Sequence, residues 1–201
     1  MATKEAFADV GHDYTSTGLN HTKVAMWSFL GSDCLFFGAM ISTYLLYRTR
    51  TLSGPTPHEI YDIPFTSVSS FVLLMSSLTM VLALAAIQRG DHRGLRIWLF
   101  ATAFLGTTFI GGQIYEFTTF VEEGLKLSTS PFGSAFFMLT GLHGAHVTVG
   151  ILMLLSLAGL SFSGKLNQED SLKVEMIGLY WHFVDIVWII IFTVVYLIPT
   201  E

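Results

Sequence analysis

The chain has 201 residues, of which 52% are hydrophobic and only 12% are charged, and its formal net charge is −5. A soluble domain carries about 25% charged residues, so the composition argues against a soluble globular protein. The ten Lys and Arg residues lie in short segments between apolar runs and offer no basic surface, which excludes nucleic acid as a partner. Cys34 is the single cysteine of the sequence, so no intrachain disulfide can form.

Five apolar stretches are each long enough for a transmembrane helix, which needs about 20 residues. They run over about 24–47, 66–88, 95–120, 133–162 and 176–198. A polar segment, 1–23, precedes them and is predicted to be an N-terminal tail rather than a cleavable signal. The sequence therefore predicts an all-α membrane protein in which residues 24–201 form one bundle of five transmembrane helices.

The orientation of these helices follows from the distribution of basic residues, because cytoplasmic loops are enriched in Lys and Arg. With the N-terminus in the cytoplasm, the inner segments hold seven basic residues and the outer segments hold three. The seven are Lys4, Lys23, Arg89, Arg93, Arg96, Lys165 and Lys173, and the three are Arg48, Arg50 and Lys126. We therefore expect the N-terminus in the cytoplasm and the C-terminus on the outer side.

Three ionisable residues are predicted to lie in the inner half of the membrane. A charged side chain there costs roughly 2.5–3.5 kcal/mol, so such residues usually face the bundle interior and are paired. At 1.5 Å per residue from the cytoplasmic helix ends, Asp33, His182 and Asp185 lie roughly 14, 9 and 14 Å deep. His182 and Asp185 are three residues apart and share a helix face. We expect Asp33 to contact His182 or Asp185, the second with a shared proton because two close carboxylates cannot both ionise.

The outer half is predicted to hold Glu116, His143 and His146. Gly141 and Gly144 flank the two histidines on a similar face of the fourth helix, and small residues let neighbouring helices approach closely. The pattern predicts a tight helix crossing whose polar groups are hydrogen-bonded across the contact.

Three functions are compatible with these buried polar residues. The preferred interpretation is structural, with interhelical hydrogen bonds that fix packing. The second is an autonomous transporter or proton channel, because intramembrane ionisable residues often mark a pathway. The third is a metal-bearing membrane enzyme, against which stand the lack of a Glu-x-x-His motif and the expected placement of the two histidine pairs in opposite halves.

The chain resembles subunit III of the haem-copper respiratory oxidases, in its five-helix form. The matching stretches are WSFLGSDCLFF at 27–37, QIYEF at 113–117, GSAFF at 133–137, GLHGAHV at 141–147 and WHFVDIVW at 181–188. They occur in the family's order and cover the chain apart from the N-terminal tail and some loops.

The resemblance implies a subunit that binds no haem, copper or other metal and has no catalytic residue of its own. In such oxidases subunit I carries the haems and the copper that reduce oxygen to water with proton pumping. Subunit III packs beside subunit I, and it is linked to assembly, sustained turnover and proton supply. Subunit II, other oxidase subunits and membrane lipids are the further expected partners, and the expected location is the bacterial plasma membrane.

Two departures from the family pattern affect these expectations. Asp33 stands where many relatives have Glu, and its side chain is one methylene shorter. This favours a structural hydrogen-bonded pair over any role that requires the longer side chain. Larger relatives have seven helices with a lipid-filled cleft beside the leading pair, which this chain lacks, so a bound phospholipid is expected only at a subunit interface. The resemblance implies a structural or proton-supply role for Glu116, His143, His146, His182 and Asp185.

The electron donor is expected to dock on other subunits, so this sequence carries little information about which donor the complex uses. Cytochrome c oxidase is the preferred assignment because that class is more widespread. Quinol oxidase is the alternative, since the five-helix form and the triplet at 32–34 resemble quinol-oxidase members.

Overall fold

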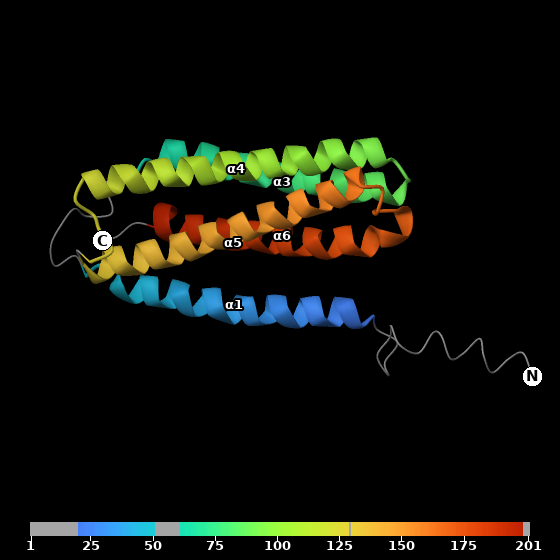
Figure 1. Cartoon of the computed structure of the whole chain (residues 1–201). Coiled ribbons are helices and arrows are strands. Elements are labelled where there is room, and N and C mark those ends of the chain that lie inside the picture. Colours follow the sequence, from blue (N-terminus) through green and yellow to red (C-terminus); the bar gives the residue numbers. More distant parts are fainter. Residues whose placement is uncertain (1–19, 51–60, 129, 199–201) are drawn as a thin grey trace, which may run out of the picture. The chain divides into compact units, whose positions relative to one another are not determined.

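The computed structural model describes residues 20–50, 61–128 and 130–198. Its long helices are α1 (His21–Tyr47), α3 (Ile63–Gln88), α4 (His92–Glu122), α5 (Pro131–Phe162) and α6 (Ser171–Phe192) (Figure 1). A short 3-10 helix, η1 (Gln168–Asp170), precedes α6, and a π-helical turn, η2 (Thr193–Leu197), continues it. Five helices in the described ranges are long and apolar enough to cross a membrane, counting α6 with its two flanking turns. The prediction of an all-α protein with five membrane-spanning helices is therefore confirmed.

The chain divides into two compact units, Met1–Phe36 and Phe37–Glu201, with the boundary inside α1. Most of the predicted polar tail, 1–23, lies outside the described residues, which begin at residue 20. The second unit holds the last three turns of α1 together with α3, α4, α5 and α6, and it contains the contacts described below.

Side-chain caps explain why three helices begin before the apolar runs do. Asp62 accepts a hydrogen bond from the Phe65 amide at 3.1 Å at the start of α3. Asp91 caps α4 through the Gly94 amide at 2.8 Å, and Ser130 caps α5 through the Gly133 amide at 3.1 Å. Each cap satisfies an amide that the first helical turn leaves without a partner, so the helix extends to the cap.

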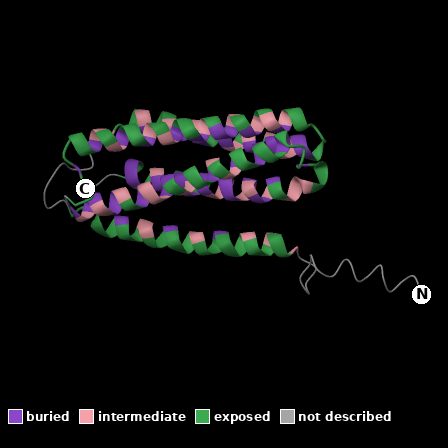
Figure 2. Ribbon diagram, viewed as in Figure 1, coloured by how far each residue is buried: buried purple, intermediate pink, exposed green. Residues whose placement is uncertain are grey.

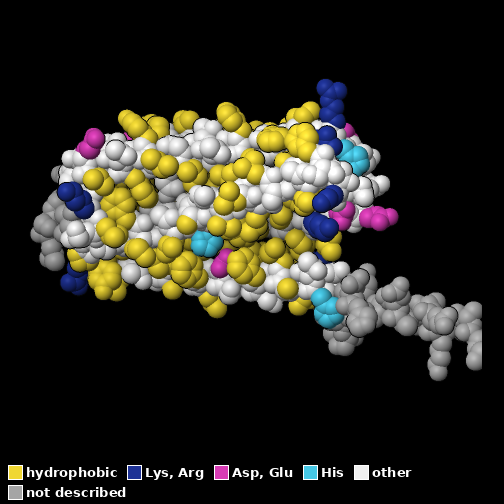
Figure 3. Space-filling view, viewed as in Figure 1, with side chains coloured by type: hydrophobic (Ala, Val, Ile, Leu, Met, Phe, Trp, Pro, Cys, Tyr) yellow, Lys and Arg dark blue, Asp and Glu magenta, His cyan; other side chains and the backbone are white. Residues whose placement is uncertain are grey.

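Four helices of the second unit form a closed bundle, in which α3 packs on α4 and α6, and α5 packs on the same two helices. Buried positions follow the inner faces of these helices (Figure 2). On the face drawn in Figure 3, Lys and Arg side chains gather at helix ends, and hydrophobic side chains cover the length between them. That distribution is the one expected of helices whose outer faces meet lipid.

Trp181 fills the middle of this bundle and is only 2% exposed. Its indole Nε1 donates to Ser76 Oγ on α3 at 3.0 Å. A Cβ added to Gly106 on α4 would lie 2.6 Å from the Trp181 ring, and one added to Gly150 on α5 would lie 2.8 Å from it. Two glycines on the adjacent helices α4 and α5 therefore leave the room that the indole occupies, and one side chain joins all three neighbouring helices.

Replacement of Gly150 by alanine tests this arrangement. The new Cβ would press on a rigid, fully surrounded ring, and overpacking of this kind costs about 1–3 kcal/mol. We expect Gly150→Ala to lower the thermal unfolding midpoint of the purified protein in detergent. The matched control is Gly159→Ala on the same helix, where an added Cβ meets nothing within 4 Å; it should leave the midpoint unchanged or raise it. Equal midpoints for the two variants would contradict the packing of Trp181.

Candidate functional site

The polar residues singled out from the sequence lie on four helices. Glu116 is on α4, His143 and His146 are on α5, and His182 and Asp185 are on α6. Asp33 is on α1 within the Met1–Phe36 unit. The other five belong to the second unit, where their surroundings can be compared directly.

Asp185 and His182 share one partner, Ser77 on α3. The Ser77 hydroxyl donates to Asp185 Oδ2 at 2.5 Å, and it lies 3.0 Å from His182 Nδ1. A hydroxyl has one proton, so Ser77 accepts from an Nδ1–H of His182 while it donates to the carboxylate. Asp185 is 4% exposed, and its Oδ1 is buried without a hydrogen-bond partner among the described residues. The expected pairing of Asp33 with this group would join the two units and stays a prediction.

Two further hydrogen bonds make the α3–α6 contact a polar seam, which we define as Ser70, Ser76 and Ser77 with Trp181, His182, Asp185 and Trp188. Trp188 Nε1 donates to Ser70 Oγ at 2.9 Å, as Trp181 Nε1 does to Ser76 Oγ at 3.0 Å. Ser70 and Ser76 donate their own protons to carbonyl oxygens of α3. Their lone pairs are thus free to accept from the indoles, which satisfies every polar atom of these two pairs.

The three serines were missed by sequence reasoning, which followed ionisable residues only. A usable signal was present in the spacing. Trp181 and Trp188 are seven residues apart and lie along one face of their helix, and the second apolar stretch carries serines at both 67–70 and 76–77. Buried indole groups usually find an acceptor, so such rows predict a hydrogen-bonded contact.

His143 lies beside the polar seam rather than in the other half of the membrane. Its Nε2 is 3.1 Å from the carbonyl oxygen of Val184, and its ring lies 4.8 Å from that of Trp188. Phe109 meets the His143 ring edge-on at 6.0 Å. The prediction that the two histidine-containing pairs, His143 with His146 and His182 with Asp185, occupy opposite halves of the membrane is therefore wrong. Helices α5 and α6 both begin before the apolar runs of the sequence. Each pair therefore lies further from the start of its helix than predicted, and the two meet near the middle of the bundle.

His146 is one turn further along α5. Its Nδ1 is 2.7 Å from the carbonyl oxygen of Leu142 in its own helix. The Tyr180 hydroxyl donates to the His146 carbonyl at 3.1 Å, and the Phe37 ring packs on the imidazole at 5.0 Å. His146 thus lies where α1, α5 and α6 meet within the second unit.

Glu116 forms a separate polar contact near the start of α3. Its Oε1 accepts from the Thr66 hydroxyl at 2.7 Å and from the Tyr196 hydroxyl at 3.1 Å. The Tyr61 ring, which precedes α3, packs at a tilt against the Tyr196 ring with centroids 4.6 Å apart, and burial raises the pKa of the Tyr61 phenol well above the usual range. Tyr61 therefore stays protonated, with its hydroxyl 3.4 Å from that of Tyr44. The carboxylate joins α3, α4 and the π-helical turn η2.

The two glycines predicted to form a helix crossing have different surroundings. A Cβ added to Gly144 would lie 2.5 Å from Gln113 Oε1 on α4, whereas one added to Gly141 would meet only Phe117 at 3.9 Å. Gln113 is fixed there because its Nε2 donates to the Thr140 carbonyl at 2.7 Å. The close approach of α4 to α5 therefore depends on Gly144 more than on Gly141.

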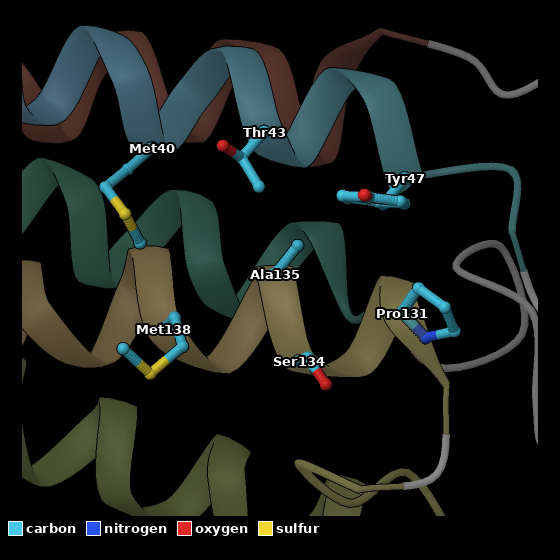
Figure 4. Close-up of a pocket in the computed structure, with 7 residues that line it drawn as sticks. All are labelled: Met40, Thr43, Tyr47, Pro131, Ser134, Ala135 and Met138. Carbon is cyan, nitrogen blue, oxygen red and sulfur yellow. The ribbon is translucent and has the colours of Figure 1, made fainter.

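A groove of about 270 Å³ separates the end of α1 from the start of α5. Met40, Thr43 and Tyr47 line it from α1, and Ser134 and Met138 line it from α5 (Figure 4). Pro131 and Ala135 complete the lining. Within the ranges that the structure describes, no three His, Cys, Asp or Glu side chains come together as a metal site would require.

The different surroundings of the two glycines lead to a paired substitution. Gly144→Ala should displace the Gln113 side chain and break its hydrogen bond to Thr140, at a cost of about 1–3 kcal/mol for the buried groups left unpaired. Gly141→Ala adds the same methyl group one turn earlier, where there is room. We expect a lower yield of folded, monodisperse protein for Gly144→Ala alone, measured by size-exclusion chromatography. A similar loss in both variants would argue against a special close approach at Gly144.

Residues 6–199 match the family described as cytochrome c oxidase subunit III. The cytochrome c oxidase subunit 3 of Bacillus sp. (strain PS3) is 40% identical over 174 residues, which are 87% of this chain and 84% of the relative. The quinol oxidase subunit 3 of Bacillus subtilis (strain 168) is also 40% identical, over 87% of this chain and 85% of the relative.

A third relative is slightly less similar. The cytochrome bo(3) ubiquinol oxidase subunit 3 of Pseudomonas aeruginosa is 37% identical over 186 residues, 92% of this chain and 89% of the relative. The match covers nearly the whole chain and includes all the polar residues described above. With its five membrane-spanning helices, the chain is a multi-pass membrane protein that belongs to the cytochrome c oxidase subunit III family.

Proposed function

We propose that this protein is the non-redox subunit III of a proton-pumping terminal oxidase, which supports assembly and sustained turnover of the subunit that reduces oxygen. The observation that carries this proposal is the family match over 6–199. Haem and copper are expected in the partner subunits rather than in this chain. Subunit I is the proposed main contact, with subunit II and other oxidase subunits as further neighbours in the bacterial plasma membrane.

The polar residues fit a structural role in such a subunit. Asp185, His182 and Glu116 make their hydrogen bonds to side chains of other helices, and His143 bonds to the backbone of α6. Hydrogen bonds of this kind fix helix packing where lipid offers no alternative partner. The proposed orientation places the N-terminus in the cytoplasm, as the distribution of basic residues favours.

The electron donor of the complex is proposed to be cytochrome c, with quinol as the alternative. Relatives named for each donor are 40% identical to this chain, so identity alone favours neither. Donor-binding residues are expected on other subunits.

A phospholipid is proposed to occupy the groove between α1 and α5. Its lining is almost wholly apolar (Figure 4). An acyl chain would fill such a groove.

Purification of the tagged chain in mild detergent tests the proposed function. We expect it to bring down a haem-containing partner, so that the preparation shows a haem absorption spectrum and several subunits on a gel. A bound c-type haem, or turnover with reduced cytochrome c, would identify the donor. A colourless, monodisperse preparation of this chain alone would overturn the proposal.

Asp33→Asn tests whether the carboxylate in α1 supports activity during prolonged turnover rather than oxygen reduction itself. Because the reacting metals are expected in subunit I, we expect the initial rate of oxygen reduction to be largely kept. Assembly yield or the activity that survives continuous turnover should fall. Asp33→Glu, which restores a carboxylate with one more methylene, is the matched control and should keep both. Complete and immediate loss of activity in a fully assembled Asp33→Asn complex would contradict a supporting role.

A further inference from the structure

We propose that the α3–α6 face around His182 is a docking surface for a transmembrane helix of a neighbouring oxidase subunit. That helix would donate a hydrogen bond to His182 Nε2 from a hydroxyl, amide or indole group. The inference rests on the proposed function, because it requires a membrane-embedded partner.

His182 lies deep in the membrane-spanning part of α6. Gln168 Nε2 donates to the Gln88 carbonyl at 2.6 Å, so the end of α3 and the start of α6 lie at the same level. Ser77 is eleven residues from Gln88, and His182 is eleven residues from Ser171, which places both roughly 17 Å along their helices from that level. The hydrocarbon core of a bilayer is about 30 Å thick, so the imidazole lies well inside it.

The His182 imidazole has one nitrogen that is hydrogen-bonded within the chain and one that can accept a further hydrogen bond. Its Nδ1–H is used by Ser77, and no described residue meets Nε2. A neutral imidazole with Nδ1 protonated carries a lone pair on Nε2, which is an acceptor. His182 is only partly buried, unlike the fully buried His143, so this acceptor is accessible from the surface between the helices. Lipid chains offer no donor, and an unsatisfied polar group in hydrocarbon is costly.

The surface around the His182 imidazole is apolar. Leu74 and Val81 flank Ser77 on its row of α3, and both are exposed. Ile186 and Ile189 continue the row of His182 on α6, and they are exposed as well. The four apolar side chains border a polar centre, which resembles an interface where a buried specific contact is surrounded by groups that exclude water. A helix with one hydrogen-bond donor among apolar residues fits this surface.

Site-specific photo-crosslinking in the purified complex tests the proposal. Benzoylphenylalanine would replace Leu74 or Ile186 on the proposed surface. The control positions are Phe104 on α4 and Leu152 on α5, which are exposed and lie at a comparable depth. We expect crosslinks from the two test positions to a helix of another subunit, identified by mass spectrometry, and few or none from the controls.

Other products would overturn the inference. These are crosslinks from Leu74 and Ile186 only to lipid, to α1 of the same chain or to a second copy, and crosslinks to another subunit from the control positions alone. A complex that forms but crosslinks elsewhere leaves the proposed function intact. Failure to recover any haem-containing partner overturns the proposed function and this inference together.

A pair of substitutions separates docking from folding. His182→Phe keeps a ring but removes the acceptor, whereas His182→Gln keeps an acceptor, the side-chain amide oxygen, at the same position. We expect His182→Phe to increase dissociation of this chain from the complex roughly tenfold on detergent challenge, the factor that corresponds to one hydrogen bond. His182→Gln should stay close to wild type in the same assay. Equal retention of the two variants would contradict a contact at His182 Nε2.

Discussion

The packing of one indole determines how the helices of the second unit meet. Trp181 needs the absence of side chains at Gly106 and Gly150, and it needs the Ser76 hydroxyl for its N–H. In a membrane the apolar side chains gain little by leaving lipid, so close packing and interhelical hydrogen bonds must hold helices together. The Trp181 ring between two glycines supplies the close packing, and its bond to Ser76 supplies the interhelical hydrogen bond.

The polar seam extends this logic along α3 and α6. Serine hydroxyls accept from two indoles, and Ser77 links a carboxylate to an imidazole. Glu116 repeats the arrangement one turn closer to the start of α3, where it accepts from a threonine and a tyrosine. Ionisable groups are thus held by neutral hydroxyl groups, an arrangement that suits a subunit whose task is to hold its shape beside a catalytic partner.

The sequence was sufficient for the fold class and the family, because long apolar runs and the five matching stretches depend on local pattern alone. It was not sufficient for the site. Depth counted from apolar boundaries separated His143 from Asp185, since the caps at Ser130 and before α6 extend the helices beyond those boundaries. The serines escaped notice because a neutral hydroxyl in a helix is common, and only the facing indoles make it informative. Gly106 and Gly150 are distant in sequence, so their shared neighbour emerges only in three dimensions.

The central claim is that this chain is a metal-free subunit whose buried polar residues hold its helices in place within an oxidase. A single-particle structure of the complex purified from native membranes tests it most directly. We expect this chain to lie beside the haem-bearing subunit, with no haem or copper of its own. Ser77 should lie between Asp185 and His182, and the Trp181 ring between Gly106 and Gly150. A metal ion held by the histidines and carboxylates of this chain, or an open water-filled path in place of those hydrogen bonds, would contradict it.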